Sequence, residues 1–333
     1  MAGRIGSAND AVAAERADQF RRSRELEEAE TEMSKPRPIV AGEVVSVTRR
    51  TMARKFLLKP DPWVEAAFGY LLALYATRLD IGVVAGVVMS DHYHLLVVDR
   101  SGRLPTLMNE LNAAMARVVN AMRGREGAVW DERQPHYQVM LDPQVALSMA
   151  AYQLANPVAA GLVEHGRDWP GFRTTPNAVG RTLRFARPAA LESEAGTYPE
   201  VATLELVAPP GWGVGGAARF GAELAALVAQ REELARREVR AAGREFEGVR
   251  RVLAAPWTTE ATAPSDSRKR GARVAAATDE ARLAAYVSGR KRFVRLHAEA
   301  KELFVAGVRE VLFPFGTWLM RVLFRASVAE APG

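Results

Sequence analysis

The chain has 333 residues and no cysteine, and its 45 Lys and Arg against 39 Asp and Glu leave a formal net charge of +6. The missing cysteines exclude a disulfide scaffold, a thiolate zinc finger, an iron–sulfur protein and a cysteine nucleophile. A metal site would therefore have to use His, Asp, Glu, Asn or Gln. The sequence has no signal-peptide pattern and no apolar run of about 18 residues, which predicts a cytoplasmic protein that does not insert into a membrane. The basic balance is compatible with a nucleic acid partner, but its sum alone does not point to one.

The first elements alternate between strand and helix patterns. Residues 1–35 are rich in Ala, Glu and Arg and predict a charged helix or a mobile arm. The β-branched run at 43–48 predicts a strand, and apolar residues at helical spacing predict a helix over 62–79. Residues 81–98 contain two Val-rich runs joined by Met89-Ser90-Asp91, which predicts a β-hairpin of buried strands.

Three further elements complete the first half of the chain. A helix is expected over 104–122, with Gly124 just past its end. An irregular edge strand is expected at 129–140, and the next helix ends at Asn156 because Pro157 follows. The order β-α-β-β-α-β-α indicates an α+β sandwich with helices on one face of a mainly antiparallel sheet.

The second half contains charge and helical patterns but no recognisable motif. Residues 165–215 predict loops and short strands such as 202–207, and residues 217–253 and 278–311 predict helices. Two dense basic clusters in this half could follow a DNA backbone, namely Arg268-Lys269-Arg270 and Arg290-Lys291-Arg292.

A His-Tyr-His triplet is the sharpest chemical feature of the sequence. Side chains alternate along a strand, so His92 and His94 project from one face while Tyr93 points to the other. Two imidazoles on one face can ligate a metal ion together. Histidines of a strand are more often ordinary core or surface residues, so the pair alone does not establish a metal site.

A second feature lies on the helix that ends at Pro157. Positions i and i+4 share a helical face, so the Tyr152 hydroxyl and the Asn156 amide can point into one site. The amide could add a neutral oxygen ligand to two histidines. Taken alone, Tyr152 is better explained as a core aromatic residue and Asn156 as a helix cap.

Together, these spaced motifs resemble the REP-associated tyrosine transposases, a branch of the single-tyrosine HUH endonucleases. The resemblance covers about residues 36–176. The segments that carry it are EVVSVTRRT, MSDHYHLLVV, Gly102-Arg103-Leu104, Trp130 with Arg133, YQLANPVAAGLV from Tyr152 to Val163, and Asp168-Trp169-Pro170.

The resemblance implies a fold and a division of the chain. The fold is α+β, a ferredoxin-like antiparallel sheet with helices on one face, which is the HUH domain at residues 36–176. The arm or helix 1–35 precedes this domain. A mostly helical extension, 177–333, follows it and would serve accessory DNA binding or assembly.

The resemblance also implies a mechanism. Tyr152 is the expected nucleophile, and His92, His94 and Asn156 are expected to hold a divalent metal, Mg²⁺ or Mn²⁺. The expected reaction cleaves and rejoins single-stranded or hairpin DNA from repeat-type palindromes through a covalent 5′-phosphotyrosine. The enzyme would act as a monomer or a homodimer, associated with the nucleoid if its source is bacterial.

Three positions depart from the family pattern. Asp91 stands where Asn or Glu is common, Tyr93 replaces an aliphatic residue, and Gln134 replaces an aromatic one. None of these changes removes an expected ligand or the nucleophile.

A DNA partner requires cations and stacking surfaces near the site. Basic residues leave the first strand beside the histidines, and others cluster in sequence near the later motifs. The expected DNA contacts are Arg49, Arg50, Arg54, Lys55, Arg103, Arg117, Arg123, Arg125, Trp130 and Arg133.

Two other functions are compatible with the same residues. A catalytically silent, domesticated DNA-binding protein would retain the fold without the reaction. A metallohydrolase would use the His pair with water as its nucleophile. An adduct between protein and DNA would distinguish the transposase chemistry from both.

Overall fold

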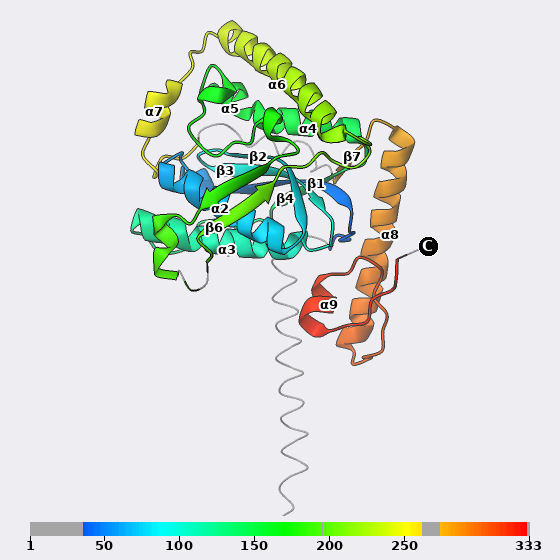
Figure 1. The fold of residues 1–333 in the computed structure, drawn as a ribbon. Helices are drawn as coiled ribbons and strands as arrows, with labels where there is room; N and C mark the ends of the chain where they lie inside the picture. Colours follow the sequence, from blue (N-terminus) through cyan, green and yellow to red (C-terminus); the bar gives the residue numbers. More distant parts are fainter. Residues whose placement is uncertain (1–35, 195, 197, 262–273, 332–333) are drawn as a thin grey trace, which may run out of the picture. The chain divides into compact units, whose positions relative to one another are not determined.

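The computed structural model describes residues 36–194, 196, 198–261 and 274–331 (Figure 1). The arm or helix expected at 1–35 and the cluster Arg268-Lys269-Arg270 lie outside these residues. The chain divides into two units, one of residues 39–287, which holds the sheet and every expected site residue, and one that includes residues 288–333. The boundary expected after residue 176 does not coincide with this division.

One five-stranded sheet forms the centre of the first unit. Its spatial order is β2-β3-β1-β4-β7, and all neighbours are antiparallel except β4 and β7. The Val-rich segment forms the predicted hairpin. The strands are β1 (Glu43–Arg50), β2 (Ile81–Val88), β3 (His92–Asp99), β4 (His136–Met140) and β7 (Ala275–Ala276).

Two helices cover one face of the sheet (Figure 1). Helix α2 (Pro62–Arg78) connects β1 to β2, and α3 (Leu104–Arg123) connects β3 to β4 and ends at Gly124, whose φ is +58°. Their apolar side chains pack against alternate residues of the central strands, including Val47, Tyr93 and Leu95. The α+β class and the ferredoxin-like order β-α-β-β-α-β are confirmed.

Helices also cover the opposite face, which differs from the prediction of helices on one face. Helix α4 (Pro143–Leu154) and α6 (Gly216–Ala241) pack on Leu96 and Val98 there. The Val- and Leu-rich strands are apolar on both faces, so both need covering. Helix α6 presents Phe220 and Leu224 at a spacing of four, which places them on one helical face.

The remaining elements are not part of the central sheet. A two-stranded sheet and α7 lie within residues 39–287, where the helix expected over 217–253 is split into α6 and α7. The mostly helical C-terminal part is confirmed. The bounds are α5 (Asn156–Ala159), β5 (Thr182–Ala186), β6 (Val201–Glu205), α7 (Gly248–Ala254), α8 (Glu280–Val305) and α9 (Leu319–Phe324), with short 3₁₀ helices at Met52–Arg54, Gly166–Asp168, Pro176–Ala178 and Ala189–Glu194.

None of the helices in the described part of the chain combines the length and the apolar character that a membrane span requires.

We expect Tyr93→Phe to lower the free energy of unfolding by about 1 kcal/mol. The buried Tyr93 hydroxyl donates a hydrogen bond of 2.7 Å to Asn112 Oδ1, which connects β3 to α3. Urea denaturation measures the change. An unfolding midpoint equal to that of the unaltered protein would show that the bond does not stabilise the packing of α3 on β3.

Candidate active site

The expected metal-binding histidines lie at one end of the sheet, where β1 ends and β3 begins. In the antiparallel pairing, Thr48 lies opposite His94 and Arg50 lies opposite His92. Paired residues of neighbouring strands point to the same face, so these four side chains share one face. This is the face on which α4 packs.

His94 is enclosed, with 8% of its surface exposed. The Asn156 amide nitrogen lies 3.2 Å from Nε2, and the Thr48 hydroxyl lies 2.8 Å from Nδ1. Because an amide nitrogen only donates, Nε2 is the acceptor and Nδ1 carries the proton. Burial holds the pKa of His94 well below its usual range, and the charges of His92 and Arg50 lower it further. The ring is therefore neutral, as a metal ligand must be.

A hydrogen-bonded chain of three residues orients His92. Arg54 Nε donates to Asp91 Oδ2 at 2.9 Å, and the other carboxylate oxygen lies 2.7 Å from His92 Nδ1. Burial alone would raise the pKa of Asp91, but the hydrogen bond and charge of His92, together with Arg54, lower it below its ordinary value. The Asp91 carboxylate thus orients the His92 ring through Nδ1 and leaves Nε2 outside this hydrogen bond.

The turn after β1 is strained where it delivers Arg54 to this chain. Ala53 and Arg54 have φ values of +50° and +55°, although neither is glycine. A left-handed conformation costs an ordinary residue about 1–2 kcal/mol. The strained backbone of this turn places the Arg54 guanidinium against Asp91.

We expect Arg54→Gln to weaken Mn²⁺ binding by about 10- to 100-fold, because residues behind a metal ligand orient it and tune its basicity. Titration of the protein with Mn²⁺ measures the affinity. Arg49→Gln is the matched control, because Arg49 is close by on β1 but lies opposite Tyr93, on the other face of the sheet from the histidines. Equal affinities for the two variants would contradict a role for Arg54 behind His92.

Tyr152 lies on α4, and 49% of its surface is exposed. Its ring packs edge-on against His94, with 6.3 Å between ring centroids. Its hydroxyl makes no hydrogen bond within the described part of the chain. Asn156 follows one helical turn later, where α5 begins. The helix end thus brings Tyr152 and Asn156 to the same imidazole.

The donor atoms suit a divalent metal with nitrogen and oxygen ligands. The rings of His92 and His94 stand nearly perpendicular with centroids 4.7 Å apart, and each has its Nδ1 engaged by an oxygen, which leaves Nε2 as the donor. A half-turn of the Asn156 amide exchanges its nitrogen for its oxygen. Among the described residues, no group of three or more His, Cys, Asp or Glu side chains could hold a metal. A metal on these two histidines would therefore take a third ligand of another kind, such as the Asn156 amide oxygen.

Arg50 is the expected DNA contact that lies beside the histidines. It is half-buried, and burial, followed by the charge of Arg54, lowers its pKa. Its guanidinium has no hydrogen bond or ion pair with any described residue. A partly buried cation without a carboxylate partner is suited to binding a phosphate.

Arg49, Trp130 and Arg133 form a cluster of their own. Trp130 packs edge-on against Tyr93, which points away from the histidines, and its Nε1 donates to the backbone of Asn112. The Arg49 guanidinium stands 5.8 Å from the centre of the Trp130 ring and donates to the backbone oxygen of Arg133. The Trp130 ring is thus an internal packing surface in this structure.

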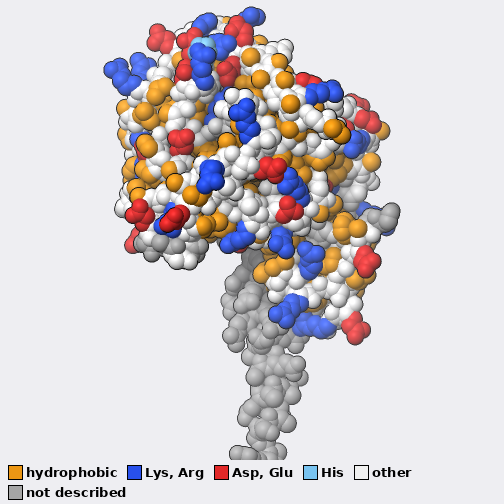
Figure 2. All heavy atoms as spheres, viewed as in Figure 1, with side chains coloured by type: hydrophobic (Ala, Val, Ile, Leu, Met, Phe, Trp, Pro, Cys, Tyr) orange, Lys and Arg blue, Asp and Glu red, His pale blue; other side chains and the backbone are white. Residues whose placement is uncertain are grey.

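The other expected DNA contacts are bonded within the chain or lie elsewhere. Arg103 directly precedes α3, at the opposite end of β3 from His92. Four residues have partners of their own: Lys55 pairs with Glu260, Arg117 donates to Tyr198, Arg123 pairs with Asp61 and Arg125 donates to Asn120. On the face drawn in Figure 2, Lys and Arg side chains are interspersed with Asp and Glu.

Sequence reasoning missed three residues of this site. Thr48 and His136 are opposite each other on β1 and β4, and both share the face of His94. Burial, followed by the charge of Arg50, lowers the pKa of His136. Gln153, next to Tyr152, is fully buried between α4 and the sheet. The alternation of strand side chains could have suggested Thr48, but only the strand pairing places it at His94.

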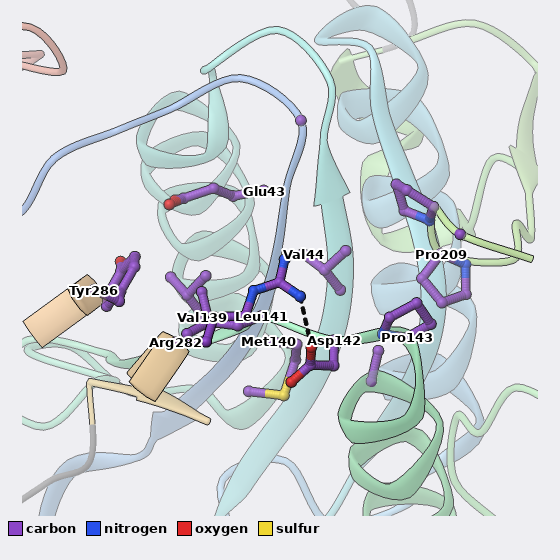
Figure 3. A pocket seen from close by; sticks show the side chains of 14 residues that line it. Glu43, Val44, Val139, Met140, Leu141, Asp142, Pro143, Pro209, Arg282 and Tyr286 are labelled. Carbon is purple, nitrogen blue, oxygen red and sulfur yellow. Dashed lines mark hydrogen bonds and ion pairs between the residues drawn. The ribbon is translucent and has the colours of Figure 1, made fainter. Parts of the chain in front are cut away.

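A pocket of about 410 Å³ lies at the other end of β1 and β4 (Figure 3). Glu43, Met140 and Pro209 line it, together with Asp142, which forms an ion pair of 2.6 Å with Arg282. The pocket contains none of the expected site residues.

Comparisons with known proteins identify two similar structures. No protein-family model and no curated protein matches the chain. A REP-associated tyrosine transposase, solved bound to a REP hairpin, is 18% identical with a TM-score of 0.37, over 50% of this chain and 89% of that one. A protein of Deinococcus radiodurans R1, provisionally assigned as a transposase, is 26% identical with a TM-score of 0.24, over 32% of this chain and 84% of that one. TM-scores this low assign no activity. The chain is thus similar to a REP-associated tyrosine transposase both in its motifs and among solved structures.

Proposed function

We propose that this protein is a metal-dependent transposase that cleaves and rejoins single-stranded or hairpin DNA through a covalent 5′-phosphotyrosine. The observation that carries the proposal is the convergence of an exposed tyrosine with two oriented imidazoles. The Tyr152 ring packs edge-on against His94, and the His92 ring stands nearly perpendicular to the same imidazole. This combination supplies a nucleophile beside a set of metal ligands.

In the proposed reaction, the Tyr152 hydroxyl oxygen attacks a backbone phosphorus and loses its proton to solvent. A bond forms between phosphorus and the tyrosine oxygen as the bond to the 3′ oxygen breaks, and that oxygen takes up a proton to become a free 3′-hydroxyl. The ester preserves the energy of the broken bond, so a 3′-hydroxyl can reverse the step and rejoin strands. The exposure of Tyr152 gives a polynucleotide access to the hydroxyl.

His92, His94 and Asn156 would hold the metal ion. A bound Mg²⁺ or Mn²⁺ supplies a Lewis acid that polarises the scissile phosphate. Thr48 and Asp91 contact the Nδ1 atoms of the two imidazoles, which would leave each Nε2 to the metal. Arg50 adds a positive charge on the same face, where it would contact a phosphate.

The decisive experiment incubates the protein with labelled single-stranded and hairpin oligonucleotides and Mg²⁺ or Mn²⁺. A labelled protein band that survives denaturation, together with a free 3′-hydroxyl strand, is the expected result. Free 5′-phosphate ends without an adduct would favour a metallohydrolase. DNA binding without cleavage across varied hairpins would favour a silent DNA-binding protein. Sedimentation of the DNA complex distinguishes a monomer from a homodimer.

A further inference from the structure

Gln153 is a buried polar residue for which the proposed chemistry has no use. It lies between Tyr152 and Leu154 on α4 and has 0% of its surface exposed. Consecutive helical residues point about 100° apart, which follows from 3.6 residues per turn. Tyr152 is therefore directed outward to the site while Gln153 is directed inward to the sheet.

The Gln153 amide connects α4 to both central strands. Nε2 donates to the Ser46 hydroxyl of β1 at 3.1 Å and to the Leu95 carbonyl of β3 at 3.3 Å. A carbonyl only accepts, so the nitrogen of the amide must face the strands. Both partners are close to the site in sequence, because Ser46 precedes Thr48 by two residues and Leu95 follows His94.

This connection has a cost. With the nitrogen facing the strands, Oε1 of Gln153 is buried without a hydrogen-bond partner among the described residues. Such an atom destabilises a fold by about 1–3 kcal/mol, so an apolar side chain of the same shape would stabilise the protein more. The contribution of Gln153 to the protein is therefore the placement of α4 on the sheet and not the stability of the fold.

The other side chains on the buried face of α4 do little to fix the position of the helix along the sheet. Its other buried residues are small or aliphatic, namely Ala146, Ala150, Ala151 and Leu154. Apolar contacts of this kind are non-directional, so they resist rotation and sliding of the helix only weakly. The two hydrogen bonds of Gln153 have defined directions and fix one register.

We propose that Gln153 is a positioning residue whose amide holds α4 in the register that places Tyr152 and Asn156 against His94. The inference rests on the proposed function for its catalytic consequence, but the placement of the Tyr152 ring can be measured without any reaction.

Gln153→Met tests the proposal, because methionine has a similar length and lacks both hydrogen bonds. We expect the adduct rate at saturating DNA to fall by about 10- to 100-fold, since small misplacements of reacting groups have effects of that size. DNA affinity should stay within about twofold. Urea denaturation should show unchanged or higher stability, because the unpaired Oε1 is gone. Gln138→Met is the matched control on the same sheet face, since Gln138 lies opposite Ser46 on β4.

A second measurement separates this proposal from the proposed function. Nuclear Overhauser contacts between the rings of Tyr152 and His94 should be lost in Gln153→Met and kept in Gln138→Met. If the unaltered protein forms no adduct but these contacts are lost in Gln153→Met, the proposed function fails while the positioning role stands. Unchanged contacts in a folded Gln153→Met protein would overturn the positioning role. Should that variant fail to fold, Ser46→Ala removes one of the two partners and is judged by the same contacts.

Discussion

Tyr152→Phe is expected to reduce formation of the protein–DNA adduct by about a thousandfold or more, to the background of the assay. The substitution removes the attacking oxygen and leaves the ring that packs on His94. The lost hydroxyl has no hydrogen-bond partner among the described residues, so stability and Mn²⁺ affinity should not change. Denaturing electrophoresis with end-labelled DNA measures the adduct.

Tyr137→Phe is the matched control for this experiment. Tyr137 lies on β4 opposite Val47, so its side chain is on the face of the sheet away from His94. This variant should form adduct at the normal rate. An adduct that persists in Tyr152→Phe would exclude Tyr152 as the nucleophile, whatever the outcome for the other residues.

His94→Ala should weaken Mn²⁺ binding by roughly 100-fold or more and reduce adduct formation in parallel. Loss of a residue behind a ligand already weakens metal binding by about 10- to 100-fold, so loss of the ligand itself should have at least that effect. His94 also contacts both Thr48 and Asn156, so its removal takes away one contact of β3 with β1 and one with the helix end at Asn156. Chelation with EDTA should stop the reaction of the unaltered protein, and added Mn²⁺ should restore it.

His136→Ala separates a metal ligand from a nearby histidine. His136 shares the face of His94 but is on β4, with β1 between the two strands. Its removal should change Mn²⁺ affinity by less than about threefold, because no metal-binding role is expected for it. A loss as large as that of His94→Ala would mean that the third ligand is His136 and not Asn156.

Local sequence patterns predict the elements of the first half of the chain well. The Val-rich hairpin and the helix that ends at Gly124 follow from short-range sequence signals. The helix expected to stop at Asn156 ends instead at Leu154, and α5 begins at Asn156 and includes Pro157 in its first turn, so the proline does not end the helical path. The covering of the second face by α6 does not follow from such signals. An amphipathic pattern shows that Phe220 needs a partner, but it does not identify Leu96 as part of that partner surface.

In the candidate site, too, the sequence predicts features within one element but not contacts between distant residues. Alternation within one strand is enough to place His92 and His94 on one face. The role of Arg54 depends on the turn after β1 and on Asp91, which is 37 residues away in the chain. From the sequence, an arginine near a motif is predicted to contact DNA. The sequence does not show whether its guanidinium faces solvent or, as for Arg54, binds a carboxylate of the same chain.

The strained turn at Ala53 and Arg54 has a consequence for the engineering of this protein. Because two ordinary residues hold left-handed conformations there, the turn is an obvious target for thermostabilisation by glycine. Relaxing it would also release the arginine that supports Asp91 and, through it, His92. Gains in heat resistance at this turn would therefore reduce activity, because the same backbone strain that lowers stability positions a residue behind the candidate metal site.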